Sequence, residues 1–303
     1  VLYQARGSRP APLRDDKVLT ACNGLMISAF ARAAMAFSDD GYRDVAARAA
    51  DFLLTNLRGA DGRLMRSHLD GRSRHNAYLD DYAFFTAALI DTYEATGESR
   101  YLTEATTLAR LLDDHHLDPA GGWYTTSDDH EELLVRDKPS RDGALPSGNS
   151  VAIANALRLA EFTGDHDHRE VAERALSAFA EPMQRYGAGV PLTLSALDFH
   201  LDVPREIVIV DGPGGADLAR VVGESFVPNR VLMRVTEAQA LAQVGLIPLL
   251  EGKVALEGAA TAYVCERGRC ELPTSDPNVL RRQLSQVQPL IPGGSPEPLT
   301  VRR

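Results

Sequence analysis

Two adjacent carboxylic acids, Asp80 and Asp81, stand just before Tyr82 and could carry out acid–base chemistry. Paired carboxyl groups act as proton donor and acceptor at sugars when their environments separate their pKa values. Neighbouring side chains on a helix diverge by about 100°, so one of the pair faces inward while the other caps the helix start. We predict Asp81 as the inward catalytic residue, Asp80 as its partner, and Tyr82 as a substrate contact. The alternative is a cap cluster without catalytic function.

An aromatic stretch followed by an acidic run forms a second candidate site. Trp123 and Tyr124 precede Asp129 and His130. An aromatic ring packs well against the apolar face of a pyranose, and imidazole titrates near neutral pH. The pattern predicts a β-hairpin over residues 121–126, an aromatic wall, substrate contact by Asp129 and proton transfer by His130. Alternatively, the acidic run is a solvated turn and Trp123 lies in the core.

Small polar residues at two predicted helix starts are candidates for substrate binding. Ser147 and Asn149 follow Pro146, and Asn23 occupies the equivalent position of an earlier helix. Free backbone N–H groups at a helix start bind anions and hydroxyl groups. Ser147 is also an ordinary N-cap, and without a strand–turn elbow or a placed base it is a poor nucleophile. Arg136 could bind a carboxylate or phosphate of the substrate, or balance the acidic run as a surface charge.

The residue spacing predicts neither a metal nor a cofactor. The histidines, cysteines and carboxylates do not follow a zinc-binding pattern, and Cys265 and Cys270 lack a second pair. The glycine run after Val210 is interrupted by Pro213, which favours a tight turn over a dinucleotide loop. The predicted site therefore works with protein side chains alone.

Helical hairpins are predicted to position these residues. Apolar residues recur at helical spacing in segments that short polar turns join in pairs: 21–37 with 42–58, 79–97 with 99–116, and 147–163 with 167–186. Longer links separate the pairs and carry most of the candidate residues: 59–78, 118–146 and 187–204. Because the partners of a pair run antiparallel, we expect these links to gather at one end of the array, where a site can form.

The chain changes character after Pro204. A β-branched run over 205–210 predicts a buried strand, and a helix over 216–222 and two further strands, near 229–235 and 259–265, follow it. The expected fold class is mainly α, an array of helical hairpins with a small C-terminal α/β appendage. The expected organisation is a helical segment, the appendage and a flexible tail rich in Pro, Gly and Ser: 1–203, 204–285 and 286–303.

Composition and charge narrow the function classes. The 303 residues include 32 basic and 42 acidic side chains, and the net charge of −10 repels nucleic acids and anionic bilayers. No apolar run approaches the roughly 20 residues of a membrane span, and residues 1–14 lack the apolar core of a signal peptide. Three cysteines are too few for a disulfide framework. We predict a cytoplasmic protein that binds a small molecule and neither nucleic acid nor membranes.

Five motifs together resemble a known family: 15–28, 78–83, 128–136, 146–150 and 260–265. They are similar to the C-terminal half of the thioredoxin-domain-containing family of the bacterial YyaL proteins and the animal spermatogenesis-associated protein 20. The resemblance covers nearly the whole chain. It implies an (α/α)6 toroid similar to N-acylglucosamine 2-epimerases and six-hairpin glycosidases, and it implies no particular reaction.

The chain departs from that family pattern at two places. The thioredoxin-like half with its Cys-x-x-Cys motif is not part of this sequence, so a thioredoxin activity is not carried over. Cys22 stands before Asn23 where the family has Trp, which removes a surface that could stack on a sugar. The resemblance therefore leaves the ligand open.

Three hairpins make half of a six-hairpin ring and would leave apolar faces exposed. We therefore expect either that an upstream segment or a second chain completes the ring, or that the tail after Pro204 covers one open edge. The leading hypothesis is a carbohydrate-active toroid, either a sugar epimerase or isomerase or a glycoside hydrolase, that uses acid–base chemistry at the ring mouth. The alternatives are a non-catalytic scaffold that binds a sugar or a partner, and a redox protein that uses Cys265 and Cys270.

Overall fold

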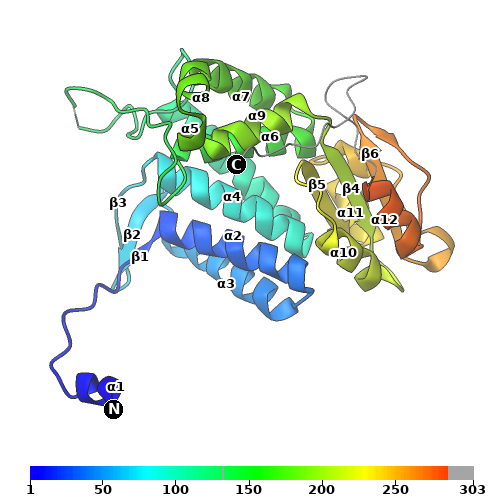
Figure 1. Cartoon of the computed structure of the whole chain (residues 1–303), viewed down its shortest axis with the longest axis horizontal. Helices are drawn as coiled ribbons and strands as arrows, with labels where there is room; N and C mark the ends of the chain where they lie inside the picture. Colours follow the sequence, from blue (N-terminus) through cyan, green and yellow to red (C-terminus); the bar gives the residue numbers. More distant parts are fainter. Residues whose placement is uncertain (132, 286–303) are drawn as a thin grey trace, which may run out of the picture.

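The helical part of the protein is a series of hairpins, as its computed structural model shows (Figure 1). The structure describes residues 1–131 and 133–285, so the predicted flexible tail, 286–303, lies outside it. A short helix, α1 (Leu2–Gly7), stands apart at the N-terminus. Three hairpins follow: α2 (Thr20–Phe37) with α3 (Asp40–Asn56), α4 (Leu79–Thr96) with α5 (Ser99–His116), and α6 (Gly148–Thr163) with α7 (His166–Ala178).

Each hairpin turns where the sequence predicts it, because a residue in the left-handed region ends the first helix. Ser38, Gly97 and Gly164 have φ angles of 52°, 71° and 69°. Glycine adopts this conformation without steric cost, which suits helix C-caps. Asp39 and Asp165 then cap the second helices of their hairpins by accepting a backbone N–H two residues on. The predicted mainly α fold of helical hairpins is confirmed.

A fourth inner helix occupies a link that we predicted as a loop. α2, α4 and α6 lie side by side as an inner layer, with their partners outside (Figure 1). α9 (Pro191–Leu201) packs beside α6 and extends this layer, and a short helix, α8 (Ala180–Tyr186), precedes it. The prediction of an irregular link over 187–204 is therefore wrong. Pro191 suggests a loop, but proline also suits the first turn of a helix, where its missing N–H has no partner to lose.

Link 59–78 forms a β-hairpin that we did not predict. Its strands are β2 (Met65–Leu69) and β3 (Arg72–Asn76), and β1 (Val18–Leu19) pairs with β2 as a third strand. The connecting residues Asp70 and Gly71 both have positive φ, 51° and 72°, as a two-residue hairpin turn requires. The Asp-Gly pair was a sequence signal for this turn.

The β-hairpin predicted over 121–126 does not form. In this stretch an isolated bridge joins Leu117 to Trp123. Gly121 instead packs closely against α7. A Cβ atom at this position would come within 2.4 Å of the Arg174 carbonyl oxygen. The glycine thus permits close packing between a loop and a helix rather than a strand reversal.

The α/β appendage is one mixed sheet with helices. The strands lie in the order β5-β4-β6-β7, with β4 and β5 parallel and β6 antiparallel to β4. The elements are β4 (Arg205–Val210), α10 (Gly215–Glu224), β5 (Arg230–Val235), α11 (Glu237–Gln243), β6 (Thr261–Glu266), β7 (Arg269–Cys270) and α12 (Pro277–Ser285). None of the helices in the described part of the chain combines the length and the apolar character needed to cross a membrane.

Alternating side chains of β4 bind the appendage to the hairpins. Ile207 and Ile209 join the apolar cluster under α10 and α12, whereas Val208 and Val210 join the core of the helical hairpins. Successive side chains of a strand point to opposite faces, so a wholly apolar strand is buried on both sides. The disulfide between Cys265 and Cys270 joins β6 to the edge strand β7.

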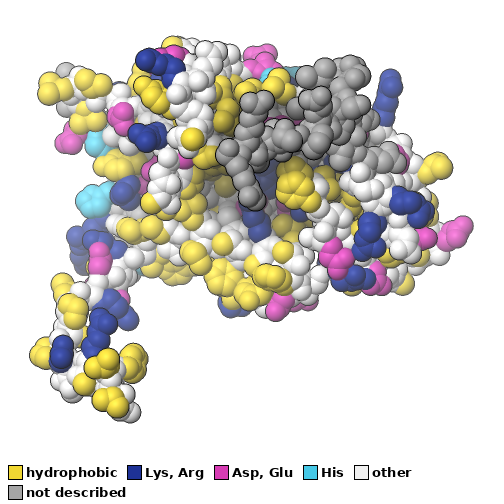
Figure 2. All heavy atoms as spheres, viewed as in Figure 1, with side chains coloured by type: hydrophobic (Ala, Val, Ile, Leu, Met, Phe, Trp, Pro, Cys, Tyr) yellow, Lys and Arg dark blue, Asp and Glu magenta, His cyan; other side chains and the backbone are white. Residues whose placement is uncertain are grey.

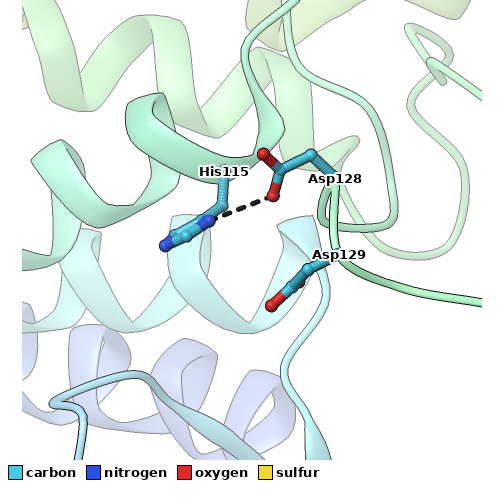
Figure 3. A group of neighbouring side chains, drawn as sticks. All are labelled: His115, Asp128 and Asp129. Carbon is cyan, nitrogen blue, oxygen red and sulfur yellow. Dashed lines mark hydrogen bonds and ion pairs between the residues drawn. The ribbon is translucent and has the colours of Figure 1, made fainter.

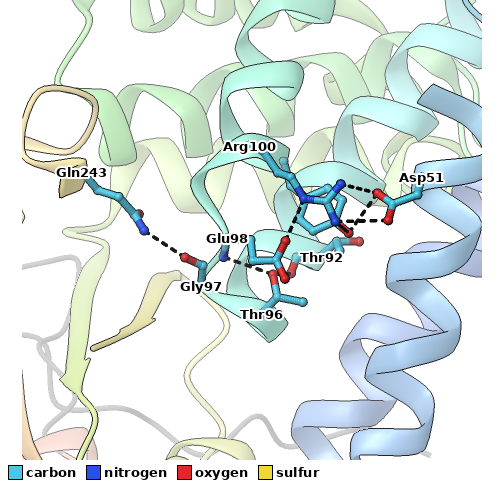
Figure 4. A network of polar contacts seen from close by, with 8 residues as sticks. Asp51, Thr92, Thr96, Gly97, Glu98, Arg100 and Gln243 are labelled. Atoms are coloured by element: carbon cyan, nitrogen blue, oxygen red, sulfur yellow. Dashed lines mark hydrogen bonds and ion pairs between the residues drawn. The ribbon is translucent and has the colours of Figure 1, made fainter. Parts of the chain in front are cut away.

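A polar network at the α4–α5 turn connects three parts of the fold (Figure 4). The Gln243 amide of α11 donates to the Gly97 carbonyl oxygen (2.9 Å) and accepts from the Tyr93 hydroxyl (3.1 Å). On the other side of the turn, Arg100 forms a bidentate ion pair with Asp51 of α3. The turn therefore holds the appendage and the first hairpin together.

Candidate functional site

We call the end of the array where α2, α4 and α6 begin the mouth, and we include the links 59–78 and 118–146. The candidate residues predicted from the sequence all lie there, because hairpins that run antiparallel bring the starts of their first helices to one end. The strands β1, β2 and β3 mark this end in Figure 1.

Asp81 holds the start of α4 to the start of α2. Its carboxylate accepts the backbone N–H groups of Tyr78 (2.9 Å) and Ala21 (3.0 Å), and Arg66 donates to it at 3.3 Å. Burial raises the pKa of this carboxyl, and the three donors oppose that rise. The structure gives the capping role to Asp81, the residue that we predicted to face inward, because the first-turn N–H groups need an acceptor.

Asp80 is the more accessible carboxylate of the pair. It is half-buried and packs against the start of α6, where the Gly148 N–H donates to it. Burial raises the pKa of the Asp80 carboxyl, and the charge of Arg66 and the Gly148 N–H partly offset the effect. A carboxyl with a raised pKa exchanges its proton closer to neutral pH than a free aspartic acid does.

His130 packs against Tyr78, which directly precedes α4. The two ring centroids lie 5.7 Å apart with the planes inclined by 54°. The Nδ1 atom of His130 is buried and has no hydrogen-bond partner among the described residues. His130 thus lies beside the residue that precedes α4, two positions before Asp80, and the Arg66 guanidinium lies 4.6 Å from the centre of the Tyr78 ring.

One imidazole and two carboxylates cluster at the edge of the mouth (Figure 3). His115, Asp128 and Asp129 each place a possible metal-ligand atom within 4.8 Å of the others, and His115 Nδ1 lies 3.1 Å from Asp128. Arg63 donates to both oxygens of Asp129 and lowers the pKa of that carboxyl. A metal ion would have to displace Arg63 and compete with the His115–Asp128 contact. The absence of a metal stays a prediction.

Trp123, Ser147 and Asn149 form a joint between the loop and α6. The Asn149 amide oxygen accepts the Trp123 backbone N–H (2.7 Å), and its Nδ2 donates to the carbonyl oxygens of Trp123 (2.9 Å) and Pro139 (2.8 Å). Ser147 caps α6 and donates to Pro139 as well. Trp123 is 1% exposed, and its indole N–H donates to Asp113 (2.7 Å). The indole therefore has no free face for a sugar, which corrects the predicted wall at this position.

The remaining predicted contacts are also held by the protein. The Tyr82 hydroxyl accepts the Leu64 N–H at 3.0 Å in the core, and Asn23 donates to the carbonyl oxygen of Leu19, four residues earlier. Arg136 donates to the Thr126 carbonyl oxygen and lies 4.2 Å over the half-buried Tyr124 ring. Sequence reasoning placed these residues at the right end of the array, but it could not show that each side chain would hydrogen-bond to the backbone of another residue.

Polar atoms without partners gather at the mouth. Most buried side-chain nitrogen and oxygen atoms that lack a hydrogen bond among the described residues belong to this end: Arg63 Nε, His116 Nε2, Thr125 Oγ1, Thr126 Oγ1, Ser127 Oγ, His130 Nδ1 and Arg136 Nε. Buried polar groups are normally hydrogen-bonded, so such a gathering marks a place where further partners can bind. Thr125 touches α4 directly, since its carbonyl oxygen accepts the Leu79 N–H at 3.0 Å.

Sequence reasoning missed a second group of charged residues, on the inner layer far from the mouth. Asp91 and Glu94 are buried on α4, and Arg158 of α6 pairs with both. The signal was present, because α4 is otherwise apolar or small over its second half and buried charges require partners.

Comparison with known proteins identifies relatives over nearly the whole chain. Spermatogenesis-associated protein 20 of Homo sapiens is 36% identical over 297 residues, which cover 93% of this chain and 38% of that protein. The Mus musculus protein is 35% identical over 299 residues, and an uncharacterized Caenorhabditis elegans protein is 27% identical over 285. The chain thus spans 38% of the length of these relatives. No protein-family model matches the chain.

Solved structures give more distant likenesses. A cellobiose 2-epimerase of Spirochaeta thermophila matches 54% of this chain and 43% of its own, with a TM-score of 0.45 and 23% identity. A family 105 glycoside hydrolase of C. acetobutylicum matches 57% of this chain and 51% of its own, with a TM-score of 0.46 and 15% identity. Likenesses of this size carry no argument about function. The sequence identity establishes the family. Over the part of its relatives that it spans, the chain belongs to the family of spermatogenesis-associated protein 20.

Proposed function

We propose that the chain is part of a carbohydrate-active protein that binds a sugar at the mouth and moves a proton on it. Asp80 is the proposed proton donor and acceptor, and His130 is the second group. The observation that carries the proposal is the Asp80 carboxyl, half-buried with a raised pKa at the start of α4. The unpartnered polar atoms at the mouth, counted over the described residues, supply hydrogen bonds that hydroxyl groups of a sugar can complete.

Isomerisation or epimerisation fits these residues better than hydrolysis. Glycoside hydrolysis uses two carboxyl groups on either side of the scissile bond. At the mouth, Asp81 is committed to a helix cap and Asp129 to Arg63. Removal and return of a proton next to a carbonyl carbon needs one proton acceptor and one proton donor. A carboxyl group and an imidazole can fill these two roles.

The test is turnover by the purified chain. Reducing monosaccharides and disaccharides are incubated with it in D₂O, and NMR follows deuterium entering the carbon next to the carbonyl and any new sugar. Asp80→Asn removes the proton-transferring group, so we expect the rate to fall by about 10²-fold or more. His130→Ala is expected to lower the rate as well.

Asp70→Asn is the matched control. Asp70 is exposed in the β2–β3 turn with a φ of 51°, a conformation that Asn tolerates, so this variant should keep the full rate. Full turnover by Asp80→Asn would refute the assigned role. Release of aryl leaving groups from glycosides without deuterium exchange would instead establish hydrolysis.

A specific observation also supports the second candidate, a scaffold that binds a sugar or partner without catalysis. Asp81, Trp123 and Asn149 are fully engaged in joints between helices. If the scaffold is the correct function, sugars raise the thermal unfolding midpoint by mass action while no substrate turns over. Deuterium exchange that depends on Asp80 would exclude this candidate.

A further inference from the structure

A cavity of about 590 Å³ lies between the inner helices and the appendage, away from the mouth. It is lined by the second halves of α2, α4 and α6, by α9, and by residues 227–230 at the start of β5. Asp91 stands eleven residues after Asp80 on α4, which places the cavity roughly 16 Å along the helix from the proposed catalytic carboxyl. Figure 2 shows basic side chains in the hollow between the hairpins and the appendage.

Two buried carboxylates in the cavity wall are shared by two arginines. Asp91 accepts from Arg32 of α2 (2.9 Å) and pairs with Arg158 of α6 (2.8 Å). Arg158 also pairs with Glu94 (3.0 Å). The Asp91 side chain is 1% exposed, so its negative charge must be compensated locally. This network joins α2, α4 and α6, and both carboxylates, Asp91 and Glu94, take part in its ion pairs.

Arg230 is the third guanidinium of the cavity and stands outside this network. It donates to the Val222 carbonyl oxygen (3.1 Å) and has no carboxylate partner within the ranges 1–131 and 133–285. Arg230 is half-buried; burial lowers the pKa of its guanidinium, and the nearby negative charges of Glu94 and Asp91 oppose that effect without forming an ion pair with it. Asp198 also lines the cavity, but its carboxylate accepts from the Asn229 amide (2.9 Å).

We propose that this cavity binds the anionic group of a small molecule, a carboxylate or a phosphate, between Arg230 and Arg32. Arg230 offers donors that no carboxylate of the described residues takes, and the Arg32 side chain is 66% exposed, so part of its guanidinium is accessible. Guanidinium groups bind carboxylates and phosphates through paired, charge-assisted hydrogen bonds. Asp198 beside them favours a ligand that also carries hydroxyl groups.

The cavity has the size and lining of a small-molecule site. Its volume falls in the range that buries a metabolite. Met35, Leu192 and Phe199 line it with apolar surface, while the charged groups come from four different helices and a strand. Charged groups on rigid elements are held in place before a ligand arrives, which lowers the entropy lost on binding.

Binding of defined anions tests the proposal. The chain is titrated with inorganic phosphate, glucuronate and, as the neutral counterpart of glucuronate, glucose, and the unfolding midpoint and calorimetric Kd are measured. We expect phosphate or glucuronate to raise the midpoint and glucose to leave it unchanged. Which of the two anions binds more tightly distinguishes a phosphate ligand from a carboxylate ligand.

Arg230→Gln is the decisive variant. It removes a half-buried charge that forms no ion pair among the described residues, so the protein without ligand should be at least as stable as wild type. The Kd for the anion should weaken about 10-fold or more. Arg32→Gln is the second variant, because its side chain is largely exposed and Arg158 still compensates the charge of Asp91. Arg220→Gln is the matched control, an exposed arginine paired with Asp217 and Glu224 on α10.

Unchanged anion binding in both Arg230→Gln and Arg32→Gln would overturn the proposal, as would an equal response to glucose or no response to either anion at millimolar concentration. Asp80→Asn separates this cavity from the mouth. If the variant binds anions normally while sugar turnover is lost, both the catalytic site at the mouth and the anion site in the cavity are supported. If the variant changes neither turnover nor anion binding, the proposed function is refuted, whereas the proposal that the cavity binds an anion is retained.

Discussion

At the scale of single residues, polar side chains at helix starts act as hydrogen-bonded joints. Asn149 makes three hydrogen bonds and is fully buried, and Asp81 ties the starts of two helices together. A short polar side chain at a helix start meets unpaired backbone N–H groups first, so a structural role competes directly with a catalytic one. Asp80, one residue earlier, is left half-buried beside the mouth.

The buried carboxyl of Asp113 gives a pH test at this scale. Burial raises its pKa to about 6, above the unfolded value of about 4. The folded state therefore holds the Asp113 proton more tightly than the unfolded state does. The contribution of this group to the free energy of unfolding is fully present below pH 4 and is lost as the pH rises through 6. Asp113→Asn can still accept the Trp123 indole N–H. We expect the variant to match wild type near pH 4 and to exceed it at pH 7 by on the order of 2 kcal/mol.

Denaturant unfolding at both pH values measures the effect. Asp70→Asn, at an exposed position, should show no such pH-dependent gain. A difference between Asp113→Asn and wild type that stays constant from pH 4 to pH 7 would contradict the raised pKa.

At the scale of elements, local sequence signals identified hairpins and missed the contents of the links. Gly97 and Gly164 end α4 and α6 in the same left-handed conformation, yet their surroundings differ. A Cβ on Gly97 would meet the Arg234 carbonyl oxygen at 2.1 Å, whereas one on Gly164 would meet nothing within 4 Å. Gly97 therefore permits close contact between the hairpins and β5 as well as the turn.

Alanine at these two glycines separates backbone strain from contact. Gly164→Ala should cost about 1–2 kcal/mol of folding free energy, because only the left-handed conformation is strained. Gly97→Ala should cost more, since the backbone of β5 must also move away. The two free energies of unfolding are compared by urea denaturation. Equal losses of unfolding free energy in the two variants would show that β5 makes no close contact with the α4–α5 turn.

At the scale of the whole molecule, the inner layer has open sides. On α2, Met26 and Phe37 are 54% and 71% exposed, and Figure 2 shows hydrophobic side chains spread over this part of the surface. On the other side, an apolar groove of about 600 Å³ runs between α7, α8 and α9, with Leu201 60% exposed. Contiguous apolar surface of this kind is typical of interfaces.

We expect the isolated chain to associate through these surfaces. Sedimentation velocity should show a coefficient that rises with concentration, and a dye that binds apolar surface should fluoresce. Leu201→Gln in the groove should weaken both signals, whereas Leu241→Gln, 81% exposed on α11 outside the groove, should not. A monomer at every concentration without dye binding would contradict the expectation that a further segment or chain completes the ring.

The sequence determined the hairpins, their turns, the buried strand β4 and the end of the array where the polar residues collect. These features follow from apolar periodicity, caps and left-handed glycines, which act over a few residues. Tertiary structure decided what each polar residue does. Asp81 became a cap because Ala21, sixty positions away, needs an acceptor. Arg230 forms no ion pair in the described part of the chain because the carboxylates near it pair with Arg158. Such partners lie on different elements, so no local pattern contains them.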